Sequence, residues 1–209
     1  MSTDTAAPTG LQSLYALSPQ AQKLLFTEAR TASKFTDEPV GDEELRAIWE
    51  LFKWAPTASN VNPLRILYVR TPEAKERLLP LIAPPNRPKS DSAPVVAVLA
   101  LDTQFAEYMP TLFPAIPQLK DAFQANPELR EENAAFNSAL QAAYFLLAVR
   151  AVGLAAGPMK GFDAKGVDEE FFPDGRWRSI LVVNIGKPAE DAWSERLPRL
   201  EYEQTVQLV

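Results

Sequence analysis

The sequence contains no cysteine and no histidine among its 209 residues. Their absence excludes disulfide bonds, thiolate nucleophiles, imidazole bases and the usual side-chain ligands of zinc and haem. Most enzyme chemistries that rely on the protein's own side chains are excluded with them. We therefore expect no metal site and no catalytic cysteine or histidine.

Long apolar runs are also missing, since no stretch approaches the roughly 18 residues that are needed to span a bilayer. The first 17 residues lack the basic segment followed by an apolar one that marks a secretion signal. The formal net charge is −6, and a negative protein repels the phosphate backbone of nucleic acids. We expect a soluble, cytoplasmic protein with neither a membrane nor a nucleic-acid partner.

What is present is the composition of an ordinary globular protein. Hydrophobic residues make up 46% and charged residues 23% of the chain, which supplies enough apolar material for one core. Chains of this length commonly form one domain. We predict a single domain over residues 1–209, with a loose N-terminal tail at 1–17 and a C-terminal extension at 193–209.

The hydrophobic periodicity predicts helical segments between strands, and hence a mixed α and β domain with a sheet flanked by helices. Trp49, Trp54, Phe136 and Tyr144 lie on apolar helical stripes, so we predict that they are core residues. Helices are expected at 18–30, 42–55, 72–82, 128–152 and 166–172, and strands at 65–70, 94–101 and 179–185.

The segment 102–127 carries four prolines among aromatic residues, which predicts an ordered but irregular excursion. We expect this excursion to form a lid at the substrate entrance. Phe105, Tyr108 and Phe113 are the candidates for contact with the substrate. The later segment 154–162 is predicted to be a turn.

Three polar segments, at 28–37, 55–63 and 157–163, together resemble the motifs of the nitroreductase family. In that family an arginine and serine cluster precedes a phenylalanine, an acidic residue and Pro-Val, and a later loop reads Pro-Ser-x-x-Asn-x-Gln-Pro. The matching residues are Phe35, Asp37, Pro39 and Val40 in the first segment, and Pro56, Thr57, Asn60, Asn62 and Pro63 in the second.

The resemblance implies an α+β fold with a central, mostly antiparallel sheet flanked by helices. It also implies a homodimer with flavin mononucleotide (FMN) at its interface and with the C-terminal extension reaching the partner. Such enzymes move hydride from NADH or NADPH through the flavin to a small-molecule substrate. Chemistry carried by the cofactor is compatible with a chain that lacks cysteine and histidine.

The resemblance extends to the subgroup that contains the malonic semialdehyde reductase of pyrimidine catabolism. It is carried by Lys53–Thr57, Asn137–Tyr144, the 157–163 turn and Arg196–Leu200. The implied reaction is the reduction of malonic semialdehyde to 3-hydroxypropionate. Two alternatives stay open. One is a broad nitroaromatic and quinone reductase, which the aromatic residues of 102–127 favour. The other is a flavin-binding protein without turnover.

The phosphate of FMN needs guanidinium groups together with hydroxyl or backbone donors. Family members often carry a further arginine where this chain has Ala29. The alternative is that the arginines here form surface ion pairs with Glu28 or Glu195. By resemblance, the phosphate-side candidates are Arg30, Thr31, Ser33, Arg196 and Arg199, and the C-terminal arginines can serve the partner's cofactor.

The flavin ring presents donors and acceptors at its pyrimidine edge, and the carboxamides of Asn60 and Asn62 can satisfy both. Asn62 stands where the family has glutamine, and the alternative for both residues is a local Asx turn. The resemblance implies that the glycine-containing turn of the third segment brings a backbone N–H close to the flavin N5. The alternative is a turn that binds no ligand. Its candidate residues are Pro158, Met159, Lys160 and Gly161.

Overall fold

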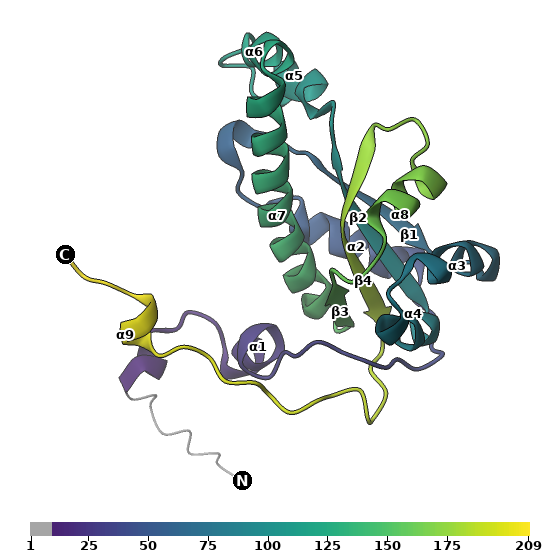
Figure 1. Cartoon of the computed structure of the whole chain (residues 1–209). Helices are drawn as coiled ribbons and strands as arrows, with labels where there is room; N and C mark the ends of the chain where they lie inside the picture. Colours follow the sequence, from purple (N-terminus) through teal and green to yellow (C-terminus); the bar gives the residue numbers. More distant parts are fainter. Residues whose placement is uncertain (1–9) are drawn as a thin grey trace.

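The structure is a computed structural model, and the residues that it describes, 10–209, form a four-stranded sheet flanked by helices (Figure 1). Neighbouring strands of this sheet are antiparallel, which confirms the predicted architecture. The strands are β1 (Leu64–Val69), β2 (Val95–Asp102), β3 (Ala155–Met159) and β4 (Trp177–Gly186), in the spatial order β1-β2-β4-β3.

β2 lies inside the sheet, and every one of its residues is buried. Its unbroken apolar run is typical of a strand that is covered on both faces. One face packs against α2 (Asp42–Phe52) and α7 (Pro127–Ala151). The other face is covered by α3 (Pro72–Leu78), α8 (Ala164–Phe171) and the segment around Phe35. The sheet therefore separates two apolar layers.

Several shorter helical turns complete the described chain. The helix predicted at 18–30 begins as expected with a Ser18 cap, but it is a short α-helix that continues as a π-helix and ends at Thr27. The shorter turns outside 102–127 are η1 (Gly10–Leu14), α1 (Pro19–Gln22), the π-helix η2 (Lys23–Thr27), η3 (Ala58–Asn60), η4 (Leu79–Leu81), η5 (Pro84–Asn86), α4 (Arg87–Ser92) and α9 (Tyr202–Thr205).

The prediction of a turn at 154–162 is wrong, because most of this segment is strand β3. Proline is tolerated there since β3 is an edge strand, whose outer side needs no N–H donor. Gly157 is required for another reason: a Cβ added to it would lie 2.6 Å from the carbonyl oxygen of Ala32. Gly157 and Pro158, the two residues that favoured a turn over a strand, therefore both have a structural reason for their place in β3.

The segment 102–127 is also more regular than predicted. It folds into η6 (Phe105–Tyr108), α5 (Met109–Leu112) and α6 (Leu119–Ala125). Phe105 is fully buried and packs edge to face on Phe123, with ring centroids 5.2 Å apart. The expectation that Phe105 contacts a substrate is therefore wrong, and Phe113 is partly buried in the same cluster. Tyr108 stays exposed.

The four aromatic residues predicted to lie in the core are at the surface instead. Trp49 is 47%, Trp54 75%, Phe136 60% and Tyr144 40% exposed. Periodicity identifies an apolar stripe on a helix, but α7 turns a different face to the sheet, with small and amide residues such as Asn137, Gln141 and Ala148. The structure thus leaves an aromatic face uncovered.

The C-terminal extension runs away from the sheet and alongside α1 (Figure 1). Every residue of 193–209 is exposed, in agreement with a tail that is not part of this chain's own core. Of the predicted N-terminal tail at 1–17, residues 1–9 lie outside the described part. Within 10–209, no helix is both long and apolar enough to cross a membrane.

Candidate functional site

The first and third motif segments meet in the fold. The N–H of Ala32 donates to the carbonyl oxygen of Ala156 at 3.2 Å, and Gly157 leaves room for this approach. The N–H and the Oγ of Ser33 both donate to the carbonyl oxygen of Ala192, at 3.0 and 2.9 Å. β3, the 30–36 segment and the start of the C-terminal extension therefore form one continuous wall.

Two of the predicted arginines converge at this wall. Nη1 of Arg30 donates to the carbonyl oxygen of Ser194 at 3.0 Å, and its guanidinium lies 5.6 Å from the centre of the Trp193 ring. Nη2 of Arg196 donates to the carbonyl oxygens of Thr27 and Ala29, at 2.8 and 3.0 Å. Thr31, which is exposed, follows Arg30 directly in the chain.

The alternative of surface ion pairs is not realised in the described residues. Glu28 pairs with Lys23 at 3.2 Å, and within 10–209 neither Arg30 nor Arg196 has a carboxylate partner. Arg199 stands apart, because among the residues that the structure describes its Nη1 bonds only the carbonyl oxygens of Leu197 and Pro198 beside it. The structure thus unites Arg30 with Arg196 but not with Arg199.

A cavity of about 230 Å³ opens beside Arg30. It is also lined by Lys23, Glu28, Arg150 and Trp193. Arg150 was not singled out from the sequence, because it lies in a long helix outside every motif. Burial, and secondarily the charge of Arg196, lowers its pKa. This end of the molecule therefore gathers cations from η2, the first motif, α7 and the C-terminal extension.

The turn after β3 is held by residues that sequence reasoning also missed. The carbonyl oxygen of Gly161 accepts from the N–H of Ala83 at 3.0 Å and from Nδ2 of Asn86 at 3.3 Å. Oδ1 of Asn86 accepts in turn from Nζ of Lys89, at 3.3 Å. A Cβ on Gly161 would come within 2.7 Å of Asn86 Nδ2. Only the proline-rich context of η5 could have drawn attention to this pair.

The other residues of the predicted turn make separate contacts. Nζ of Lys160 donates to the carbonyl oxygen of Ile180 at 2.8 Å. Pro158 and Met159 belong to β3, and the Met159 sulfur lies 4.0 Å from Ser90 Oγ. The Lys160 side chain is thus tied to β4.

The second motif segment lies elsewhere on the chain. The N–H of Ala58 donates to Oδ1 of buried Asn137 at 2.8 Å, and Asn60 Nδ2 donates to the carbonyl oxygen of Leu112 at 2.8 Å. Asn137 and Arg150 are separated along α7 by about 20 Å, at 1.5 Å per residue. One chain therefore does not bring all three motif segments together.

The amides of this loop are engaged within the chain. Asn62 Nδ2 donates to the carbonyl oxygen of Asn60 at 2.7 Å, while its Oδ1 accepts from Gln141 Nε2 at 3.1 Å. Asn60 itself has a positive φ of 53°, a conformation that asparagine adopts more readily than most residues. In this chain alone, the Asn60 amide is bonded to Leu112 and the Asn62 amide to Asn60 and Gln141.

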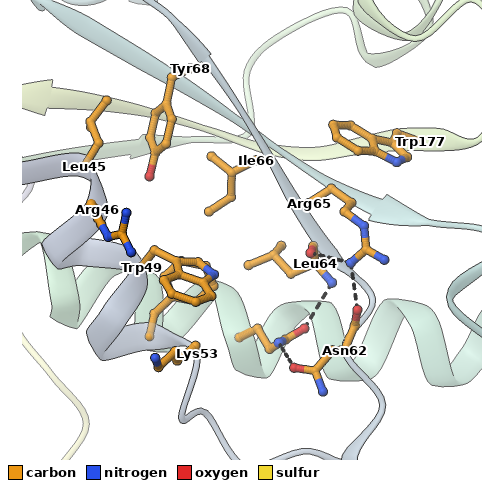
Figure 2. Close-up of a pocket in the computed structure, with 12 residues that line it drawn as sticks. Leu45, Arg46, Trp49, Lys53, Asn62, Leu64, Arg65, Ile66, Tyr68 and Trp177 are labelled. Carbon is orange, nitrogen blue, oxygen red and sulfur yellow. Dashed lines mark hydrogen bonds between the residues drawn. The ribbon is translucent and has the colours of Figure 1, made fainter. Parts of the chain in front are cut away.

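A larger cavity, of about 720 Å³, lies between α2 and the edge strand β1 (Figure 2). Trp49 and Lys53 face it from α2, and Arg65 and Tyr68 from β1. The Tyr68 hydroxyl is buried and has no hydrogen-bond partner among the described residues, and burial raises its pKa. The cleft is therefore partly apolar, rimmed by cations, and adjacent to an unpaired strand edge.

Asp102 anchors the 102–127 excursion beside this cleft. Its fully buried carboxylate accepts from Arg65 Nη2 at 2.7 Å and from Arg176 Nε at 3.0 Å. The N–H of Gln104 adds a third donor at 2.9 Å. The ring of Tyr108 lies 5.3 and 6.0 Å from the two guanidinium groups. Tyr108 is therefore held in place by stacking, although it is exposed.

Comparison with known proteins agrees with this architecture. A model of the nitroreductase family matches residues 27–187. A Streptomyces coelicolor protein named as an NADH dehydrogenase/NAD(P)H nitroreductase is 57% identical over 187 residues, which cover 90% of this chain and 93% of the relative.

Two solved structures share the fold. A Bacillus subtilis nitroreductase has a TM-score of 0.80 at 24% identity and covers 88% of this chain and 97% of its own. A nitroreductase from Exiguobacterium sibiricum, in complex with FMN, has a TM-score of 0.79 at 20% identity and covers 92% and 98%. The family model and the curated relative together show that this chain belongs to the nitroreductase family.

Proposed function

We propose that the protein is an FMN-dependent oxidoreductase that transfers hydride from NADH or NADPH to a small substrate. The observation that carries the proposal is the junction of the Arg30 segment with β3, beside the guanidinium groups of Arg30 and Arg196, which have no carboxylate partner among the described residues. The name of the Streptomyces relative and the FMN bound to the Exiguobacterium structure support the same activity.

The residues at this junction fit the chemical groups of FMN. A phosphate dianion is bound best by guanidinium forks, and within 10–209 Arg30 and Arg196 donate only to carbonyl oxygens. A Cβ on Gly161 would lie 2.7 Å from Asn86 Nδ2, so the packing on Asn86 requires a position without a side chain in this turn. Bound there, FMN would supply the hydride acceptance and donation that the side chains of this protein do not offer.

In this proposal the chain's residues bind and orient the cofactor and do not react. Arg30, Thr31, Ser33 and Arg196 hold the phosphate side, and the backbone of 158–161 faces the ring, with Asn86 and Lys89 behind it. Preorganised donors of this kind stabilise negative charge on a reduced ring without reorganisation.

We also propose a homodimer that completes the site. The 55–63 loop lies far from Arg30 in one chain, so a second copy is the natural source of Asn60 and Asn62. The exposed aromatic residues of α2 and α7 form the kind of apolar surface that marks an interface. The C-terminal extension, with Arg199, would then lie in the partner's cleft beside β1.

For the substrate we propose malonic semialdehyde, reduced to 3-hydroxypropionate, on the strength of the subgroup resemblance. A broad nitroaromatic and quinone reductase is the second candidate, because the Streptomyces relative is named a nitroreductase and Tyr108 offers an exposed aromatic surface. Turnover of the semialdehyde, a nitroaromatic compound and a quinone, measured side by side with NADH and NADPH, separates the two. Much faster reduction of the aromatic substrates would overturn the semialdehyde assignment.

The first test is the visible absorbance spectrum of the purified protein and the identity of any cofactor released on denaturation. Flavin bands with FMN in the supernatant are the expected result. A colourless protein that does not take up added FMN would refute the proposal. Flavin without NAD(P)H oxidation by any acceptor would leave a flavin-binding protein, and a monomer by sizing would contradict the shared site.

A further inference from the structure

Arg150 has no role in the site proposed so far, although it lines the cavity beside Arg30. It belongs to the last turn of α7 and lines the same cavity as Arg30 and Lys23. Its half-buried guanidinium makes one long hydrogen bond, of 3.4 Å from Nη1 to the carbonyl oxygen of Leu25. Arginine carries five N–H donors, so the described residues engage only a small part of its capacity.

The groups around Arg150 carry an excess of positive charge. They come from η2, the first motif and the C-terminal extension, and they are Lys23, Glu28, Arg30 and Arg196. The one carboxylate in this set, on Glu28, pairs with Lys23. Burial, and then the charge of Arg196, lowers the pKa of Arg150, as expected where like charges are packed together.

A purely structural role accounts for part of this arrangement. The helix dipole favours a cation at the end of α7, and the bond to Leu25 ties η2 to that helix. Neither effect explains why Arg30 and Arg196 approach the same place with only carbonyl oxygens as acceptors. Several guanidinium groups that converge without a carboxylate are what a phosphate dianion requires.

We propose that Arg30, Arg150 and Arg196 together bind a phosphate monoester, and that Arg150 contacts it directly from the end of α7. The inference rests on the proposed flavin function, because it adds a residue to the phosphate side of that site. FMN and NADPH both carry such a group. The FMN phosphate is the expected ligand, since Arg30 belongs to the segment that joins β3.

The test compares FMN with riboflavin, which differs from FMN only by the phosphate. In the full-length protein stripped of flavin, Arg150→Met keeps the apolar stem of the side chain and removes its charge. The affinity for FMN should fall roughly tenfold or more, as for a lost charge-assisted bond, while the affinity for riboflavin should not change. A merely structural role would lower both equally. Arg150→Lys should recover part of the FMN affinity.

Arg130→Met is the matched control, because it removes a cation from the opposite end of α7. It should leave both affinities unchanged. If Arg150→Met spares FMN but raises the KM for NADPH and not for NADH, the site takes the nucleotide phosphate instead. A different outcome is that the wild type binds FMN but Arg150→Met changes neither the ratio of FMN to riboflavin affinity nor the ratio of the KM values for NADPH and NADH. In that case the inference is wrong and the proposed function stands.

A direct probe keeps the inference testable even if the wild type binds no flavin. Calorimetric titration with inorganic phosphate should show binding to the wild type and a clear loss in Arg150→Met. Phosphate binding without flavin binding would refute the proposed function alone. No phosphate binding to the wild type, or equal binding to both proteins, would overturn the arginine site.

Discussion

The two ends of α7 satisfy their polar groups in opposite ways. Toward the N-terminal end, from the middle of α7, buried Asn137 and Gln141 bond the loop that follows α2 and the start of β1, and Asp102 is matched by Arg65 and Arg176. At the C-terminal end, Arg30, Arg150 and Arg196 have only carbonyl oxygens as acceptors in the described residues. The amides and the carboxylate named at the first end are paired within one chain, whereas the arginines at the second end have no anion among the described residues.

Because of this difference, we expect the first end to contribute mainly to the stability of the fold and the second end mainly to ligand binding. Buried polar groups that are fully paired hold a unique arrangement of the chain, and breaking one leaves a costly unpaired partner. Cations without an anion repel one another, so a ligand that neutralises them also stabilises the fold by mass action. Substitutions at the first end should lower the free energy of unfolding, and substitutions at the second should mainly lower affinity for the ligand.

The largest effect is expected for Asp102→Ala, which removes the buried carboxylate shared by Arg65 and Arg176 and leaves Arg176 with Glu107 as its ion-pair partner. Removing one partner of a buried pair costs about 3 kcal/mol, at the low end of the usual range because Arg65 and Arg176 keep some solvent contact. Urea unfolding of the purified protein measures the change. The ratio of FMN to riboflavin affinity should remain that of the wild type, since the phosphate side lies at the other end.

Asp191→Ala serves as its control. Asp191 also pairs with a cation, Lys34, but both side chains are largely exposed, and exposed pairs contribute little. Its unfolding midpoint should stay close to that of the wild type. An Asp102→Ala protein that is equally stable would mean that the buried carboxylate does not hold the 102–127 excursion in place.

A smaller loss of stability, with a loss of binding, is expected for Gly157→Ala. The new Cβ would lie 2.6 Å from the Ala32 carbonyl oxygen, so β3 and the first motif must move apart. Overpacking of this kind costs about 2 kcal/mol. Because the junction carries the proposed cofactor site, FMN and riboflavin affinity should both fall, which flavin titration detects. Unchanged flavin affinity would show that the junction is not the binding wall.

Much of this fold follows from local sequence patterns. β1, β2 and β4 are runs of branched apolar residues, and α2 and α7 have helical periodicity with clear ends, so their positions could be predicted. β3 could not, because its Gly157 and Pro158 are signals of a turn. They are compatible with a strand only because β3 lies at the edge and touches Ala32, which is a tertiary fact.

The candidate site shows the same limit. Arg30, Gly161 and the asparagine loop could be found because they belong to motifs, whereas Arg150, Asn86 and Lys89 lie outside all three motif segments. Periodicity also could not tell which face of α7 meets the sheet. Phe136 is exposed although it is large and apolar, since small and amide side chains allow the closer contact with α2 and β1. Only the packed structure decides between two apolar faces.

The smallest effect is expected for Trp193→Ala, at the binding end. The Trp193 ring lies 5.6 Å from the Arg30 guanidinium, and an exposed contact between a cation and a ring contributes about 0.5–1 kcal/mol. Losing it frees Arg30 without removing its charge, so FMN affinity should fall about two- to fivefold, while riboflavin affinity should hold. Trp193→Phe keeps a ring and should restore most of the difference. A loss as large as that of Arg150→Met would instead mean that the indole contacts the ligand itself, and that this end of the molecule binds through more than its charges.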